Sequence, residues 1–229
     1  SSRRRHTRCS RWSRGLGDVY KRQLVARTPE VMPRGVSSGD DFKPLLESAD
    51  ILVVGPGLGQ SPWSQHLLQL AAASGKPLVL DADGLNLLAA GDHVADDLRD
   101  NWVLTPHPGE AARLLGCSTG EVQGDRFAAV QALQRRYGGV VVLKGNGSLI
   151  ADSEQRLLSD YGNPGMASGG MGDVLSGVIG SLLAQHLPIL EAAALGVCLH
   201  GAAADIAAQE GQRGLAATDL IPEMRALLG

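Results

Sequence analysis

Before residue 150, the hydrophobic positions of this 229-residue chain form short runs separated by glycine-rich or polar stretches. Four of these runs are rich in β-branched residues, which predicts strands buried on both faces of a sheet: 51–54, 78–80, 102–105 and 140–143. The stretches around them predict helices at 62–73, 84–90, 108–115 and 121–137. Strands alternating with helices predict an α/β fold with a mostly parallel sheet and helices on both faces.

The pattern changes in the last third of the chain. Residues 148–151 and 156–159 flank a polar turn at 152–155, which predicts a hairpin. From residue 174 onward the chain reads as three helices, at 174–185, 189–209 and 218–228. There is no internal repeat, low-complexity tract or linker. Residues 24–229 are therefore predicted to form one domain.

Polar and glycine-rich segments follow each of the four predicted parallel strands. They are residues 55–59, 81–83, 105–107 and 144–147. In an open α/β sheet, ligands bind outside the carboxyl ends of the strands. We therefore expect these four segments to meet at one edge of the sheet and to form a binding site.

Composition and charge narrow the class of protein. Hydrophobic residues make up 44% of the chain and aromatic residues only 3%, as expected for close helix–sheet packing. After residue 23 there are 13 basic and 23 acidic residues, a balance of −10, which argues against nucleic-acid binding. No apolar run reaches the length expected for a bilayer span, so no membrane role is expected. The three cysteines form no CxxC motif, and reduced thiols in the cytoplasm are expected.

Residues 1–23 differ sharply from the rest, with eight basic residues and one acidic residue. This segment has three interpretations: a nucleic-acid or targeting arm, a disordered tail, or a non-native segment. It lacks the apolar stretch of a signal peptide. Because it looks like translated sequencing-adapter read-through, we favour the third interpretation and leave it out of the fold.

The segment 163–173 is the most informative for chemistry. It holds four glycines and Asp173 directly before an apolar helix. A glycine-rich loop at a helix N-terminus offers free N–H groups and a positive dipole end, which bind anions. A carboxylate there would repel phosphate, so Asp173 is interpreted as a general base for a hydroxyl that attacks a phosphoryl group. The alternative is that Asp173 only caps the helix. The spacing fits neither a P-loop nor a Rossmann fingerprint.

The other segments each allow a chemical and a structural role. The glycines of 55–59 permit close approach of a ligand, or simply make a tight turn. Asp81 and Asp83 could hold Mg²⁺, or one of them could cap the helix that begins at Gly84. Asn86 is either a polar lining residue or a first-turn helix residue.

The two remaining segments carry a histidine and a lysine. His107 lies between two prolines that restrict it, which favours a binding role over a structural one. Glu110 is as readily a helix cap as a catalytic group. Lys144 follows a buried strand and is interpreted as neutralising nucleotide phosphate; the alternative is a solvated lysine at the start of a hairpin.

Four motifs in this order resemble the ADP/ATP-dependent NAD(P)H-hydrate dehydratases: Val-Gly-Pro-Gly-Leu-Gly at 54–59, Leu-Asp-Ala-Asp-Gly-Leu-Asn at 80–86, Thr-Pro-His-Pro-Gly-Glu at 105–110 and the glycine-rich stretch ending at Asp173. The resemblance runs from Leu24 to the C-terminus. It implies a ribokinase-like three-layer sandwich and a reaction in which hydrated NADH or NADPH is dehydrated with ADP, or alternatively ATP, and Mg²⁺.

The resemblance also implies roles for individual residues. Asp173 would be the catalytic base, and Gly57, His107 and Asp173 would contact the hydrated nicotinamide. The adenine nucleotide would be bound by Lys144, Gly145, Asn146, Gly147, Ser148, Gly169, Gly170 and Gly172. Metal ligands are not assigned, and a homo-oligomer is left open.

The match departs from the family pattern in two places. The strand, loop and helix expected upstream of Leu24 are missing, so we expect a fragment whose own activity is open. Ser168 stands where the family has Thr, which keeps the hydroxyl. Two alternatives stay open. A kinase of the same fold acting on a vitamin precursor would share the Gly-x-Gly-Asp signature, and a nucleotide-binding module without catalysis would follow from the missing strand.

Overall fold

The computed structural model describes residues 26, 28, 30–91 and 99–229. The chain divides into two compact units, Ser1–Glu47 and Ser48–Gly229. The sequence interpretation of residues 1–23 falls outside the described residues. Helix α2 (Gly39–Ser48) begins in the first unit and was not predicted from the sequence. Reciprocal hydrogen bonds between Ser38 and Asp41 fix its start.

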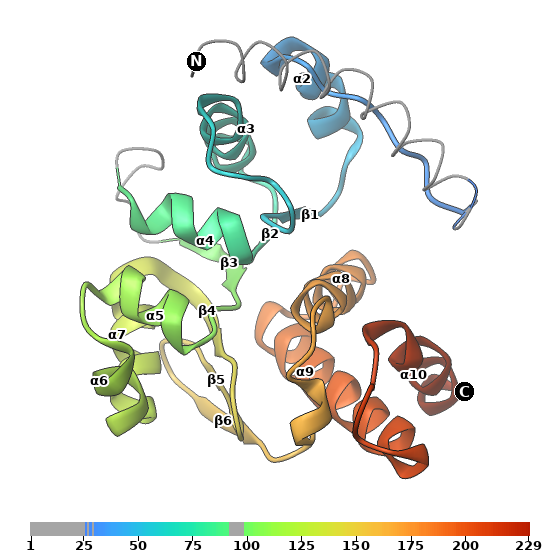
Figure 1. The fold of residues 1–229 in the computed structure, drawn as a ribbon. Coiled ribbons are helices and arrows are strands. Elements are labelled where there is room, and N and C mark those ends of the chain that lie inside the picture. Colours follow the sequence, from blue (N-terminus) through green and yellow to red (C-terminus); the bar gives the residue numbers. More distant parts are fainter. Residues whose placement is uncertain (1–25, 27, 29, 92–98) are drawn as a thin grey trace, which may run out of the picture. The chain divides into compact units, whose positions relative to one another are not determined.

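The second unit contains a six-stranded sheet in the order β1-β2-β3-β4-β5-β6 (Figure 1). The first four strands run parallel, and the last two continue the sheet as an antiparallel hairpin. The strands are β1 (Leu52–Val54), β2 (Leu78–Leu80), β3 (Arg99–Leu104), β4 (Gly138–Leu143), β5 (Ser148–Ala151) and β6 (Arg156–Ser159). The predicted mostly parallel sheet and the predicted hairpin are confirmed.

Helices cover both faces of this sheet (Figure 1). Those on one side are α3 (Pro62–Ala73), α4 (Ala82–Ala89), α5 (Pro108–Leu115), α6 (Thr119–Gly124) and α7 (Arg126–Tyr137). On the other side lie α8 (Met171–Ala184) and α9 (Ile189–Ala207), followed by α10 (Leu220–Leu228). Short 3-10 turns complete the chain: η1 (Pro164–Met166), η2 (Ala208–Glu210) and η3 (Ala217–Asp219). This is the three-layer sandwich expected from the alternation of elements.

The core follows the two-residue period of the strands. Val79, Val103 and Val140 point to one face and pack with Leu175 and Ile179 of α8. Their neighbours along the strands are also fully buried: Leu78, Leu80, Leu104 and Val141. Burial on both faces explains why these strands read as continuous apolar runs.

Some predicted boundaries are wrong. The single helix predicted at 121–137 is two helices, because Asp125 leaves helical geometry with φ −145° and ψ 87°. Its side chain accepts a hydrogen bond from the Ala128 amide and so caps α7. Helix α4 begins at Ala82, two residues earlier than predicted, and α8 begins at Met171, three residues earlier.

The expectation that no apolar stretch is long enough for a bilayer also needs correction. Residues Ile189–Glu210 form one helical stretch of 22 residues with mean hydropathy 1.5, enough by length and composition alone. Half of the relevant window is buried in the protein, and α9 packs against α8, α10 and strands β3 to β6. Alanines, leucines and glycines that pack closely in a core also raise the hydropathy, so we assign α9 to the core.

Candidate active site

The four predicted segments meet at the carboxyl edge of the sheet. Backbone pairing continues one residue beyond the strands: the Asp81 amide donates to the Val54 carbonyl, and the Thr105 amide donates to the Leu80 carbonyl. The Lys144 amide likewise donates to the Pro106 carbonyl, at 2.9 Å. The predicted convergence is therefore confirmed.

A buried ion pair lies at the centre of this edge. The Lys144 Nζ atom is 2.7 Å from Asp81 Oδ1, and the Ser176 hydroxyl of α8 donates to Asp81 Oδ2 at 2.8 Å. Burial alone would raise the pKa of Asp81, but the charge of Lys144 and the hydrogen bonds from Lys144 and Ser176 outweigh it and hold the pKa below its usual value. Asp81 is thus ionised, and both of its carboxylate oxygens accept hydrogen bonds from neighbouring side chains.

This pair changes two of the sequence interpretations. Asp81 occupies the N-cap position of α4 but makes no capping hydrogen bond with its side chain. Lys144 is not a solvated lysine, because its side chain is only 20% exposed and its ammonium faces Asp81. A Cβ atom on Gly172 would lie 3.2 Å from Lys144 Nζ, so the pair directly underlies the glycine-rich loop.

His107 and Glu110 form the start of α5. His107 Nδ1 accepts from the Gly109 amide at 2.9 Å, and Glu110 Oε2 accepts from the His107 amide at 2.8 Å, which is a capping box. The capping alternative for Glu110 is confirmed. The other ring nitrogen, His107 Nε2, lies 3.5 Å from Glu110 Oε1, and the His107 side chain is about half exposed.

The loop at 55–59 is held against the start of α4. Asp83 Oδ2 accepts from the Gly59 amide at 2.8 Å, so Asp83 fixes this loop and does not cap α4. A Cβ on Gly55 would lie 1.7 Å from the Asp81 carbonyl oxygen, and only glycine fits there. In contrast, nothing lies within 4 Å of a Cβ on Gly57, which faces open space as a ligand contact requires.

The glycine-rich loop ends at the N-terminus of α8. Its N-cap is Gly170, with φ 86° and no side-chain cap, so the first amides of α8 are uncapped by any side chain. Asp173 lies in the first turn and not at the N-cap, which contradicts the interpretation of Asp173 as a helix cap. Asp173 is exposed and makes no hydrogen bond or ion pair with any residue that the structure describes.

Other contacts, which the sequence did not reveal, hold this loop in place. Asp205 of α9 accepts from the Gly162 amide and from the Asn163 side chain, both at 2.9 Å. The Ser168 hydroxyl donates to the Leu215 carbonyl at 3.0 Å. Asp205 lies 43 residues after Gly162 and 42 after Asn163, so no local pattern connects it with them. Its charge within an otherwise apolar helix was the sequence feature that could have pointed to a role.

The segment 144–148 forms the turn between β4 and β5, and Arg126 of α7 fastens it. The Arg126 guanidinium donates to the carbonyls of Leu143 and Asn146, which bracket Lys144 and Gly145. A Cβ on Gly145 would lie 2.9 Å from this guanidinium. Among the described residues no carboxylate pairs with Arg126, and burial lowers its pKa. Arg126 was not predicted as a site residue, because the helix break at Asp125 that positions it was not predicted either.

His200 lies behind the glycine-rich loop and was also missed. Burial, partly offset by a hydrogen bond with the Met171 backbone, lowers the pKa of His200 to about 4. The ring is therefore neutral at physiological pH. Its Nε2 atom is buried and has no partner in the described part of the chain.

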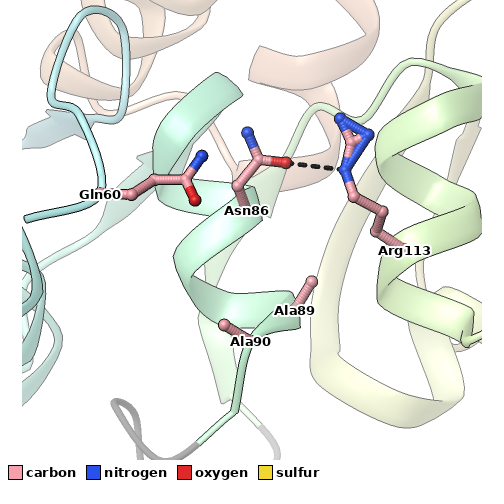
Figure 2. A pocket seen from close by; sticks show the side chains of 5 residues that line it. All are labelled: Gln60, Asn86, Ala89, Ala90 and Arg113. Atoms are coloured by element: carbon pink, nitrogen blue, oxygen red, sulfur yellow. Dashed lines mark hydrogen bonds between the residues drawn. The ribbon is translucent and has the colours of Figure 1, made fainter.

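A hollow of about 420 Å³ adjoins the loop 55–59 and the α4–α5 pair. Figure 2 shows its lining: Gln60, Asn86, Ala89, Ala90 and Arg113. Asn86 faces this hollow, which favours the polar-lining interpretation over a plain helix residue. Its Oδ1 atom accepts from Arg113 Nε at 3.0 Å.

Metal ligands are sparse at this site. Among the described residues there is no group of three or more His, Cys, Asp or Glu side chains that could hold a metal ion. Asp81 is engaged by Lys144 and Ser176, and Asp83 by Gly59. Of the carboxylates discussed here, only Asp173 has its oxygens free, which fits a Mg²⁺ ion held mainly by nucleotide phosphates and water.

The chain is similar to known proteins along most of its length. A family model described as NAD(P)H-hydrate dehydratase matches residues 18–225. The bifunctional NAD(P)H-hydrate repair enzyme Nnr of Coxiella burnetii is 54% identical over 202 residues, which cover 87% of this chain and 41% of that protein. This chain thus spans about two fifths of the length of the bifunctional relatives that it matches.

In a shorter relative and in a solved structure, the match covers a larger share of the other protein. The ADP-dependent (S)-NAD(P)H-hydrate dehydratase of Neisseria meningitidis serogroup B is 41% identical, covering 93% of this chain and 73% of that protein. The ADP/ATP-dependent NAD(P)H-hydrate dehydratase of Bacillus subtilis, co-crystallized with ATP/Mg²⁺ and soaked with CoA, superposes with a TM-score of 0.75 at 28% identity. It covers 90% of this chain and 76% of that one. The predicted ribokinase-like fold is confirmed.

Proposed function

The chain belongs to the NAD(P)H-hydrate dehydratase family, and we propose that it dehydrates hydrated NADH or NADPH with an adenine nucleotide as co-substrate. The observation that carries this proposal is the environment of Asp173. Its carboxylate is exposed, unpaired among the described residues, and in the first turn of a helix whose leading amides no side chain caps. A base beside an anion site is what phosphoryl transfer to a hydroxyl needs.

The proposed reaction has two steps. Asp173 accepts the proton of the ring hydroxyl while its oxygen attacks the terminal phosphoryl group. The new oxygen–phosphorus bond forms as the phosphoanhydride bond breaks, so ADP would leave AMP. The phosphate then departs with the ring oxygen, a neighbouring carbon loses a proton, and the ring double bond returns. No oxidant or reductant is required.

The glycine-rich loop would stabilise the moving negative charge. Gly169, Gly170 and Gly172 offer backbone amides with little side-chain obstruction, and the dipole of α8 points its positive end there. The Asp81–Lys144 pair under Gly172 and the Asp205 contacts at Gly162 keep the loop fixed. Fixed donors cost no reorganisation when the charge develops.

The turn 144–148 is proposed to bind the nucleotide mainly through its backbone. The Lys144 ammonium is engaged by Asp81, so Gly145, Asn146, Gly147 and Ser148 would supply amide and hydroxyl donors. Gly57 and the half-exposed side chain of His107 would face the hydrated nicotinamide. We propose that Mg²⁺ accompanies the nucleotide, with Asp173 as the nearest protein carboxylate; when bound, it neutralises phosphate charge.

The compartment proposed for this reaction is the cytoplasm. Of the described cysteines, Cys117 and Cys198 are free thiols, as a reducing compartment would maintain. ADP is the favoured nucleotide, because the Neisseria relative is named ADP-dependent.

Absorbance recovery tests the proposal directly. Hydrated NADH absorbs weakly at the reduced-nicotinamide band, and mixing it with the protein, Mg²⁺ and ADP or ATP should restore that band. Accumulation of a stable phosphorylated vitamin precursor, with no recovery of the band, would select the kinase instead. Calorimetric binding of ADP without any turnover would select a non-catalytic nucleotide-binding module.

A further inference from the structure

The hollow formed by Gln60, Asn86 and Arg113 adjoins the groups proposed to contact the nicotinamide. Gln60 follows the loop that contains Gly57, and Asn86 lies one turn beyond Asp83, which holds Gly59. Arg113 Nη1 donates to the carbonyl of Gly109, two residues after His107, at 3.1 Å. A substrate whose nicotinamide touches Gly57 and His107 therefore has this hollow beside it.

The chemistry of the lining suits a phosphorylated sugar. Gln60 and Asn86 carry amide groups that donate to and accept from hydroxyls. Figure 2 shows the Gln60 side chain, just after the 55–59 loop, pointing toward Asn86 on α4, with the Arg113 guanidinium of α5 on the other side of Asn86. A guanidinium matches phosphate oxygens in a planar, two-pronged geometry.

The partners of Arg113 in the described part of the chain are uncharged. Its partners are the amide oxygen of Asn86 and the Gly109 carbonyl, both neutral. Within the described ranges no carboxylate forms an ion pair with Arg113, although residues 24–229 carry an excess of ten acidic groups. A guanidinium that has only neutral partners among the described residues, and that lines a hollow of about 420 Å³, is suited to bind an anion.

We propose that this hollow binds the part of the dinucleotide substrate beyond its nicotinamide mononucleotide half, with Arg113 contacting the adenosine-side phosphate of the pyrophosphate. The inference rests on the proposed function, because it assumes a hydrated dinucleotide as substrate. A dinucleotide extends well beyond its nicotinamide ring and needs a second area of protein for its phosphates and second ribose. Binding energy gained there would hold the ring in place for chemistry at Asp173.

A truncated substrate isolates this contact. Hydrated NADH has the pyrophosphate and distal nucleoside, whereas the hydrated reduced nicotinamide mononucleotide ends at its single phosphate. In Arg113→Met we expect the KM for hydrated NADH to rise about 10-fold or more, the cost of one charged hydrogen-bonded contact. The KM for the mononucleotide and the KM for ADP should stay near wild type. Arg135→Met, on an exposed part of α7, is the matched control.

Two further arms keep the test decisive. Gln60→Ala leaves both Arg113 hydrogen bonds in place and should weaken only the dinucleotide, by a few-fold. Calorimetry with NADP⁺ should show weaker binding to Arg113→Met than to the wild type, whether or not the protein turns over. Equal loss for dinucleotide and mononucleotide, or a rise confined to the KM for ADP, would overturn the inference. A wild type that binds NADP⁺ through Arg113 but does not turn over would defeat the proposed function alone.

Discussion

At the scale of single residues, the site depends on buried ionisable groups whose states are fixed by their neighbours. Asp81 is 1% exposed and ionised because Lys144 and Ser176 contact it. His200 is 5% exposed and neutral because burial disfavours its charge. Each group makes a separate contribution to stability, and each acts in a different pH range.

Replacement of Asp81 should lower the free energy of unfolding and should also reduce the loss of stability in acid. Asp81→Asn leaves the partly buried Lys144 ammonium without its carboxylate, so the free energy of unfolding should fall by about 3 kcal/mol. The folded-state pKa of Asp81 lies below its ordinary value of 3.8. The ion pair therefore stabilises the wild type fully above pH 3.8, and this stabilisation is lost as the pH falls through the lower, folded-state pKa. Urea unfolding at pH 7 and at pH 3 measures both effects. The exposed Asp160→Asn is the control, and a difference from wild type that is equally large at both pH values would contradict the account.

His200 should make the protein sensitive to mild acid. Its pKa is about 4 when folded against 6.5 when unfolded, so the unfolded chain binds more protons between these values. The contribution of His200 to the free energy of unfolding should be fully present above pH 6.5. It should be lost as the pH drops toward 4, which lowers the free energy of unfolding by up to about 3 kcal/mol. His200→Leu should flatten the melting temperature over this range, whereas the exposed His66→Gln should not. An unchanged slope in His200→Leu would show that another group causes the acid loss.

At the scale of elements, the loops of the site are fastened by side chains from helices. Arg126, at the start of α7, bridges two carbonyls of the β4–β5 turn. Asp205 of α9 holds the beginning of the glycine-rich loop. The loops therefore owe their shape to tertiary contacts, and these contacts are where mutations should separate nucleotide binding from substrate binding.

Arg126→Met should weaken nucleotide binding by the 144–148 turn and leave substrate binding unchanged. Loss of both hydrogen bonds should raise the KM for ADP about 10-fold, equivalent to about 1.4 kcal/mol, while the KM for hydrated NADH stays near wild type. Arg126→Lys keeps the charge but cannot reach both carbonyls, so it should recover only part of the affinity. Steady-state kinetics with each substrate varied in turn checks this. Equal rises in both KM values would mean that Arg126 supports the whole site.

At the scale of the whole molecule, periodicity predicted most of the architecture. Strands such as Leu78–Leu80 are buried on both faces and read as plain apolar runs, and the segments that follow the parallel strands meet at one edge of the sheet as predicted. Pairings between distant residues were not predictable, because nothing local relates Lys144 to Asp81 or Asp205 to Gly162. The break at Asp125 was missed because helical residues continue on both sides of it.

We propose above that Asp173 is the base of a phosphoryl-transfer site, and one substitution tests this role directly. Asp173→Asn keeps the size of the side chain and removes its ability to accept a proton. Turnover of hydrated NADH should fall by about 10²–10⁴-fold, the usual contribution of a general base. ADP affinity should hold or rise slightly, because a negative charge near the phosphates is gone. Measured by recovery of the reduced-nicotinamide absorbance, a near-normal rate in Asp173→Asn would contradict the account.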